Sequence, residues 1–79
     1  MTIAGMSDVE LDVLQLACPL PILRAKKSLS DMSSGQVLRV VATDGGSPRD
    51  FVDFCSKTGN ELLSSIEENG EFVFLIRRR

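Results

Sequence analysis

The spacing of hydrophobic residues changes along the chain, and each change marks a new element. From Val9 to Leu16 apolar and acidic positions partly alternate, which predicts a first strand. From Pro19 onward apolar residues recur at helical spacing, and Gly35 suits the position just past the end of that helix. The apolar helical positions are Ile22, Ala25, Leu29 and Met32. The segment Val37 to Thr43 is β-branched and mostly apolar, so we expect a second strand that is covered on both faces.

A second helix is expected after the turn Asp44-Gly45-Gly46. Ser47 is predicted to cap it, Pro48 suits its first turn, and Gly59 closes it. One face of this helix carries the residues expected to pack on the sheet, namely Phe51, Phe54, Cys55 and Thr58.

The end of the chain predicts a hairpin. Two segments, Glu61 to Glu68 and Glu71 to Arg77, flank Asn69-Gly70, the dipeptide that a tight type I′ turn favours. The element order is therefore strand, helix, strand, helix, strand, strand. A strand-helix-strand unit crosses over right-handed, so the first two strands are parallel and both helices lie on one face. We expect an α/β two-layer sandwich with a four-stranded mixed sheet, forming a single domain over residues 1–79 with a flexible segment at residues 1–8.

Composition and charge exclude several classes of protein. Of the 79 residues, 43% are hydrophobic and 25% charged, which excludes a disordered or low-complexity chain. A net charge of −2 does not select for nucleic acid, so no direct nucleic-acid binding is expected. The longest apolar run, Phe72 to Ile76, is far shorter than a membrane span, and the N-terminus lacks a signal-peptide pattern. We therefore expect a cytoplasmic protein with no membrane partner.

The missing residue types narrow the chemistry further. The chain contains no His, Trp or Tyr, which removes the Ser-His-Asp and Cys-His nucleophile pairs. Its two cysteines, Cys18 and Cys55, are too few for a four-thiolate site and form no CxxC pair, so neither a metal nor a cofactor is expected. Any chemistry of this chain is expected to pass through sulfur.

Cys18 stands at the corner between the first strand and the first helix. We expect it at the cap position, followed by Pro19 and Pro21, which lack an amide N–H and stiffen the first turn. The Leu20 amide and the helix dipole favour the thiolate, so the pKa of Cys18 is predicted to be lowered. Because both helices start at the same edge of the sheet, the turn from Asp44 to Ser47 is predicted to lie beside Cys18.

The remaining polar features have simpler interpretations. The amides of the Asp44-to-Ser47 turn suit an anion, but a turn with a Ser cap is favoured because no P-loop lysine is present. Arg24, Lys26 and Lys27, with the arginines at 77–79, form either a basic docking surface or a solvated face, and the solvated face is favoured. Cys55, in the middle of a helix, is predicted to be a core residue.

Three functions are considered for this chain. The first, which the family resemblance given in the next paragraph implies, is a carrier that holds sulfur on Cys18 as a persulfide. The second is a non-catalytic regulatory or binding module that uses the same sheet edge. The third is a thiol redox protein that cycles Cys18 and Cys55, which requires their α-carbons to lie within roughly 7 Å.

With its Cys18-Pro19-Leu20-Pro21 motif and matching positions elsewhere, nearly the whole chain resembles the TusA-like (SirA-like) sulfur-carrier family. The most specific part is the CPxP motif Cys18-Pro19-Leu20-Pro21. The other matching positions are Leu11-Asp12 with Leu14 and Leu16, Gly35, Ala42-Thr43-Asp44, Asp50-Phe51 with Phe54-Cys55, and Phe74-Leu75-Ile76-Arg77-Arg78. The resemblance implies a βαβαββ fold and a sulfurtransferase-type role in which Cys18 accepts sulfane sulfur from a partner and passes it on.

The resemblance also indicates classes of partner. The donors of the family are cysteine desulfurases or rhodanese-like proteins, and the acceptors serve tRNA thiolation, molybdenum-cofactor maturation or sulfur metabolism. In the tRNA-thiolation branch a basic residue often precedes the cysteine and an acidic residue separates the prolines. This chain has Ala17 and Leu20 at those positions, so the resemblance does not select that branch.

Overall fold

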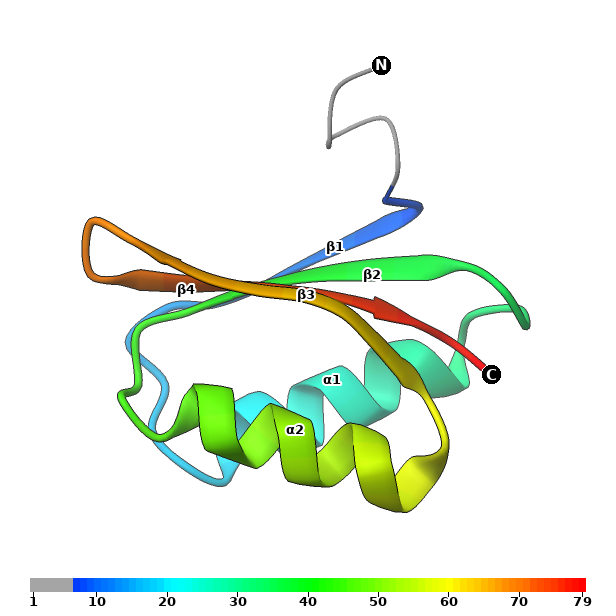
Figure 1. The fold of residues 1–79 in the computed structure, drawn as a ribbon, viewed down its shortest axis with the longest axis horizontal. Helices are drawn as coiled ribbons and strands as arrows, with labels where there is room; N and C mark the ends of the chain where they lie inside the picture. Colours follow the sequence, from blue (N-terminus) through cyan, green and yellow to red (C-terminus); the bar gives the residue numbers. More distant parts are fainter. Residues whose placement is uncertain (1–6) are drawn as a thin grey trace.

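Two helices cover one face of a four-stranded sheet in the computed structural model of the protein, which describes residues 7–79 (Figure 1). In chain order the elements are β1 Val9–Val13, α1 Leu20–Ser30, β2 Val37–Ala42, α2 Ser47–Thr58, β3 Glu61–Glu68 and β4 Glu71–Arg77. Within residues 7–79 the opposite face of the sheet carries no helix, so the prediction that the second strand is covered on both faces is wrong (Figure 1). Among residues 7–79, no helix has the length and apolar character needed to cross a membrane.

The sheet is mixed, with its strands in the order β1-β2-β4-β3. Strand β1 runs parallel to β2, with Val9 opposite Leu38 and Val13 opposite Ala42. Strand β4 is antiparallel to both β2 and β3. This arrangement confirms the predicted two-layer α/β sandwich with a four-stranded mixed sheet and both helices on one face.

The hydrophobic core lies between the sheet and the two helices. Alternate residues of β2 (Leu38, Val40 and Ala42) are fully buried, as the pleat of a strand under two helices requires. From α2, the Phe51 ring stacks on Phe74 of β4 with the ring centroids 4.6 Å apart. The same core includes Val13, Ala25, Leu29, Met32, Phe54, Cys55 and Ile76. Both helices are therefore fixed to the sheet by apolar burial.

The first strand ends earlier than predicted, at Val13 and not at Leu16. The Leu14 amide donates a hydrogen bond to the Asp12 carboxylate (2.8 Å), and the Gln15 amide donates to the Thr43 hydroxyl (2.8 Å). Gln15 also has a φ of 67°, a left-handed conformation that no strand continues. These local bonds turn the chain away from the sheet before it reaches Cys18.

The prediction that Ser47 caps α2 is wrong. Gly46 is the cap residue and Ser47 is the first residue of the helix. The Ser47 hydroxyl is buried and has no hydrogen-bond partner within residues 7–79. The Gly46 amide instead donates a hydrogen bond to the Asp44 carboxylate (3.2 Å). This bond forms because the backbone turns here, with the Ser47 amide donating to the Asp44 carbonyl (3.0 Å).

The C-terminal half follows the sequence prediction closely. Gly59 ends α2 with a φ of 80°, and its amide donates to the Cys55 carbonyl (2.9 Å). Strands β3 and β4 have the predicted bounds. Asn69 and Gly70 have φ angles of 53° and 79°, the two positive values that a type I′ turn requires.

Of the N-terminal segment expected to be flexible, residues 1–6 lie outside the described residues. Asp8, within the same segment, is hydrogen-bonded to the first residue of β2. Its amide donates to the Val37 carbonyl (2.8 Å), and its carboxylate accepts from the Val37 amide (2.9 Å).

Candidate functional site

Cys18 is an exposed free thiol in the loop between β1 and α1. The helix begins one residue later than predicted: Pro19 is the cap residue, Leu20 the first helical residue and Pro21 the second. Cys18 is therefore not the cap. The peptide bond that joins Cys18 to Pro19 is cis. Pro21 is buried while Cys18 remains exposed, so the corner is anchored on its helical side and open at the sulfur.

The Leu20 amide does not serve the sulfur as predicted. It donates a hydrogen bond to the Ala17 carbonyl at 3.0 Å. The next bond of this turn runs from the Leu23 amide to the Pro19 carbonyl at 3.1 Å. The donor that was expected to favour the thiolate is thus already used by the backbone.

The predicted lowering of the Cys18 pKa is also wrong, because the structure raises it. The largest cause is the carboxylate of Asp50, which accepts a hydrogen bond from the thiol and so favours its protonated form. Partial desolvation and then the negative charges of Asp50 and Asp44 raise the pKa of Cys18 further. In the free protein the sulfur is therefore held toward the neutral thiol.

The turn from Asp44 to Ser47 was predicted to lie beside Cys18, and one of its residues, the charged Asp44, acts on the thiol. Asp44 acts on Cys18 through its charge. Gly45, Gly46 and Ser47 are not among the residues that line the groove at Cys18. The residue that sequence reasoning missed is Asp50. The indication was present, because Asp50 lies in the first turn of α2 and both helices were expected to start at one edge of the sheet.

A groove of about 400 Å³ lies between α1 and α2 and includes Cys18. Its lining is formed by Cys18, Pro19, Ile22, Leu23, Lys26, Asp50, Asp53, Phe54, Lys57 and Thr58. Leu23, one of the apolar residues of this lining, is 54% exposed. Asp53 and Lys57 are paired across one turn of α2, with Nζ and Oδ2 2.9 Å apart.

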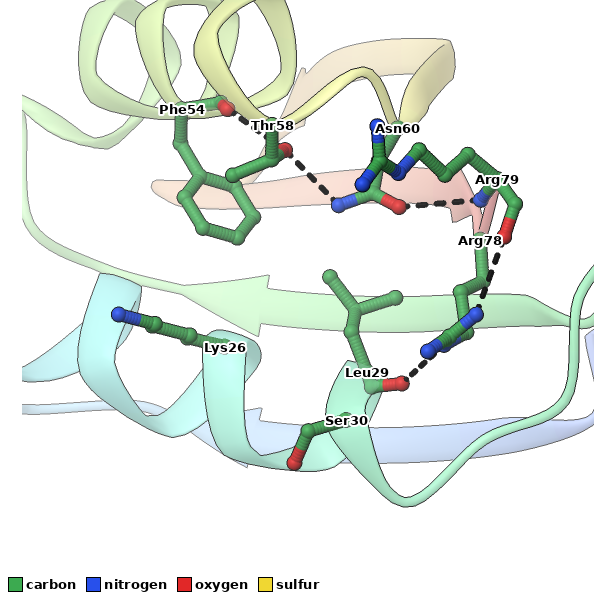
Figure 2. Close-up of a pocket in the computed structure, with 8 residues that line it drawn as sticks. All are labelled: Lys26, Leu29, Ser30, Phe54, Thr58, Asn60, Arg78 and Arg79. Carbon is green, nitrogen blue, oxygen red and sulfur yellow. Dashed lines mark hydrogen bonds between the residues drawn. The ribbon is translucent and has the colours of Figure 1, made fainter.

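A second hollow of about 180 Å³ adjoins this groove, since Lys26, Phe54 and Thr58 line both. Figure 2 shows that its polar groups are largely satisfied by one another. The Asn60 side chain donates to the Thr58 hydroxyl (2.8 Å) and accepts from the Arg79 amide (3.1 Å). Arg78 donates from Nε to the Leu29 carbonyl (2.6 Å), which satisfies a carbonyl at the end of α1.

The basic residues considered as a docking surface do not share one environment. Lys26 and the arginines at 78 and 79 line the hollow of Figure 2. Nζ of Lys27 lies 4.0 Å from Oδ2 of Asp31, and Arg77 forms an ion pair with Glu61. Arg24 lines neither the groove nor the hollow.

Within residues 7–79, no group of three or more His, Cys, Asp or Glu side chains is placed to hold a metal ion.

Cys55 packs in the core, as predicted, with 5% of its surface exposed. Burial raises the pKa of its thiol to about 11, so it carries little thiolate near neutral pH. Both cysteines are free, one buried and the other exposed. This environment favours packing over the redox role considered for the Cys18–Cys55 pair.

We expect Cys55→Ala to lower the free energy of unfolding by about 1 kcal/mol, because a small buried side chain is shortened. Sulfur uptake should stay at the wild-type level. Urea unfolding and intact-mass measurement of sulfur uptake check the two parts. Loss of uptake in a Cys55→Ala protein of wild-type stability would show that Cys55 is a working thiol.

Comparison with known proteins places this geometry in a family. The family model described as "Sulfurtransferase TusA" matches residues 9–78. The chain is 63% identical over 71 residues to the sulfur carrier protein TusA of Allochromatium vinosum, covering 90% of this chain and 93% of that protein. It is 39% identical over 72 residues to the sulfur carrier protein TusA of Pseudomonas entomophila, covering 91% of this chain and 90% of that protein.

The fold agrees with a solved structure as well. The crystal structure of a SirA-like protein from Desulfitobacterium hafniense superposes with a TM-score of 0.78 at 25% sequence identity, covering 87% of this chain and 95% of that one. A match over nearly all of the folded residues, with one exposed thiol in the loop that precedes α1, confirms the resemblance seen in the sequence. The chain belongs to the TusA family and is a sulfur carrier.

Proposed function

We propose that Cys18 carries the sulfur, which it accepts as a persulfide from one protein and passes to another. The observation that supports this assignment is the exposure of the thiol beside the groove between α1 and α2. The second cysteine of the chain, Cys55, is buried in the core. A docked protein therefore reaches one sulfur of this carrier and not the other.

The transfer step is a thiol exchange at a sulfane sulfur. Cys18 loses its proton, and its thiolate attacks the outer sulfur of the donor's persulfide. The sulfur–sulfur bond of the donor breaks as the new bond forms on Cys18. The donor cysteine leaves as a thiolate and takes up a proton, so the two proteins exchange one sulfur atom without net oxidation. Delivery to the acceptor repeats the same exchange with Cys18 as the leaving thiolate.

A sulfur carrier works with partner proteins at both ends of the relay. We assign the donor to the cysteine desulfurases or rhodanese-like proteins, and the acceptor to a sulfurtransferase of tRNA thiolation, molybdenum-cofactor maturation or sulfur metabolism. The relay is proposed to operate in the cytoplasm, where a free exposed thiol stays reduced.

The test is the intact mass of the protein after incubation with a cysteine desulfurase and cysteine. We expect the mass to rise by one sulfur atom and to return to its starting value after reduction with a thiol reagent. A rhodanese-like donor loaded from thiosulfate provides the second arm. A folded protein that gains no sulfur from either donor would favour the regulatory or binding module instead.

A further inference from the structure

Two carboxylates, Asp44 in the turn before α2 and Asp50 in the first turn of α2, lie close to each other and close to Cys18. A side chain at Gly46 would meet both, because its Cβ would stand 3.3 Å from Oδ2 of Asp44 and 3.6 Å from Oδ2 of Asp50. Asp50 also lines the groove that contains Cys18. Among the described residues, neither carboxylate takes part in an ion pair, whereas the neighbouring Asp53 is paired with Lys57.

We propose that Asp50 is a charge gate on Cys18, which holds the sulfur as a neutral thiol in the free carrier and releases it when a protein partner brings a cation to this carboxylate. This inference rests on the proposed function of Cys18. The occupant it requires is a donor or acceptor protein with an Arg or Lys side chain next to its own reactive cysteine. The argument for that occupant is charge complementarity with an acidic pair that no cation of residues 7–79 neutralises.

The electrostatic direction supports a gate. The Asp50 carboxylate and the charge of Asp44 raise the pKa of Cys18, and the thiol is a much weaker nucleophile than the thiolate. The cations that line the groove are Lys26 of α1 and Lys57 of α2, and Lys57 is already paired with Asp53. A partner cation would bind the Asp50 carboxylate, so that this carboxylate no longer accepts a hydrogen bond from the thiol. The cation would also neutralise the negative charge of Asp50. Both changes favour the thiolate at the moment when the donor sulfur is present.

The gate has a chemical consequence for selectivity. A small oxidant or electrophile that collides with the free carrier brings no cation, so it meets mostly the neutral thiol. A matched protein partner removes the restraint before the exchange begins. The proton of Cys18 then passes to solvent, and the departing donor thiolate takes up a proton in turn, so the exchange stays balanced.

Asp50→Asn tests the gate because it removes the charge while it keeps the size of the side chain. Two effects of opposite sign are expected. Alkylation of Cys18 by iodoacetamide becomes faster at pH 7, and the midpoint of its pH profile moves to lower pH, since a pKa that was raised by the carboxylate falls. Sulfur transfer from a cysteine desulfurase becomes slower by about tenfold in kcat/KM, mainly through a higher KM, because the partner cation loses its counter-charge.

Matched variants separate the gate from a structural effect. Asp53 lies on the same helix and in the same groove as Asp50, and we expect Asp53→Asn to leave the alkylation midpoint of Cys18 unchanged. Asp44→Asn should move the midpoint in the same direction as Asp50→Asn but by less, since Asp44 acts through its charge alone. Asp50→Lys imitates the docked cation and should give the lowest midpoint of the series. Circular dichroism and the melting temperature establish which variants are folded.

The outcomes are distinguishable from those of the proposed function. An alkylation midpoint that stays in place or rises in a folded Asp50→Asn protein would overturn the gate, even if wild type accepts sulfur. Should Asp50→Asn fail to fold, the midpoint of Asp44→Asn decides in the same way. Wild type that takes no sulfur from any protein donor refutes the proposed function, whereas the alkylation series still measures the effect of Asp50. If the Asp50→Asn protein loses both Cys18 alkylation and sulfur transfer, Asp50 has a structural role, and this result would overturn the gate as well.

Discussion

Cys18→Ala is expected to take up no sulfur from a cysteine desulfurase while it remains folded. The substitution removes the sulfur that we assign to the persulfide, and the remaining thiol, Cys55, is buried with its pKa raised to about 11. Intact-mass measurement under the conditions that load wild type should show the unmodified mass. The expected effect is complete loss, because no other exposed thiol exists in the chain.

The fold should tolerate this change. Cys18 is exposed and lies outside both β1 and α1, and it is not part of the hydrophobic core. Surface substitutions of this kind usually change the free energy of unfolding by less than about 0.5 kcal/mol. Cys18→Ser serves as a control that keeps the polarity of the side chain. Sulfur found on Cys55 in either variant would contradict the assignment.

Much of the fold was predictable because its determinants are local. The type I′ turn at Asn69 and Gly70 and the helix end at Gly59 depend on residues that tolerate positive φ, and all three lie where the sequence places them. The order of the elements then follows from hydrophobic periodicity. The end of β1 was missed because it depends on the Gln15 amide bonding to Thr43, which is 28 residues away in the chain.

The site was predictable in its position but not in its electrostatics. Cys18 is exposed at the expected corner because the proline-rich segment and the start of α1 are adjacent in sequence. The direction of its pKa depends on Asp50, which only the tertiary structure brings to the sulfur. A helix dipole can be estimated from one helix, whereas the effect of a carboxylate requires the position of the second helix as well.

Phe51→Ala is expected to give the largest loss of stability of any single truncation considered for this protein. Phe51 is fully buried, stacks on Phe74, and meets Phe54 edge to face with the centroids 6.4 Å apart. Truncating a buried Phe typically lowers the free energy of unfolding by about 3–5 kcal/mol. A natural domain has roughly 5–15 kcal/mol in total, and a chain of this size is expected near the lower end. Urea unfolding followed by circular dichroism measures the loss.

Val52→Ala is the matched control, because Val52 is the next residue of α2 and is 56% exposed. It should change the free energy of unfolding by about 0.5 kcal/mol or less. A similar small change in Phe51→Ala would mean that the stacked rings do not fix α2 to the sheet. The consequence reaches the site, since Asp50 directly precedes Phe51 in the first turns of α2. If Phe51 sets the position of that helix, folded molecules of Phe51→Ala should also lose part of the Asp50 effect, and their Cys18 alkylation midpoint should move to lower pH.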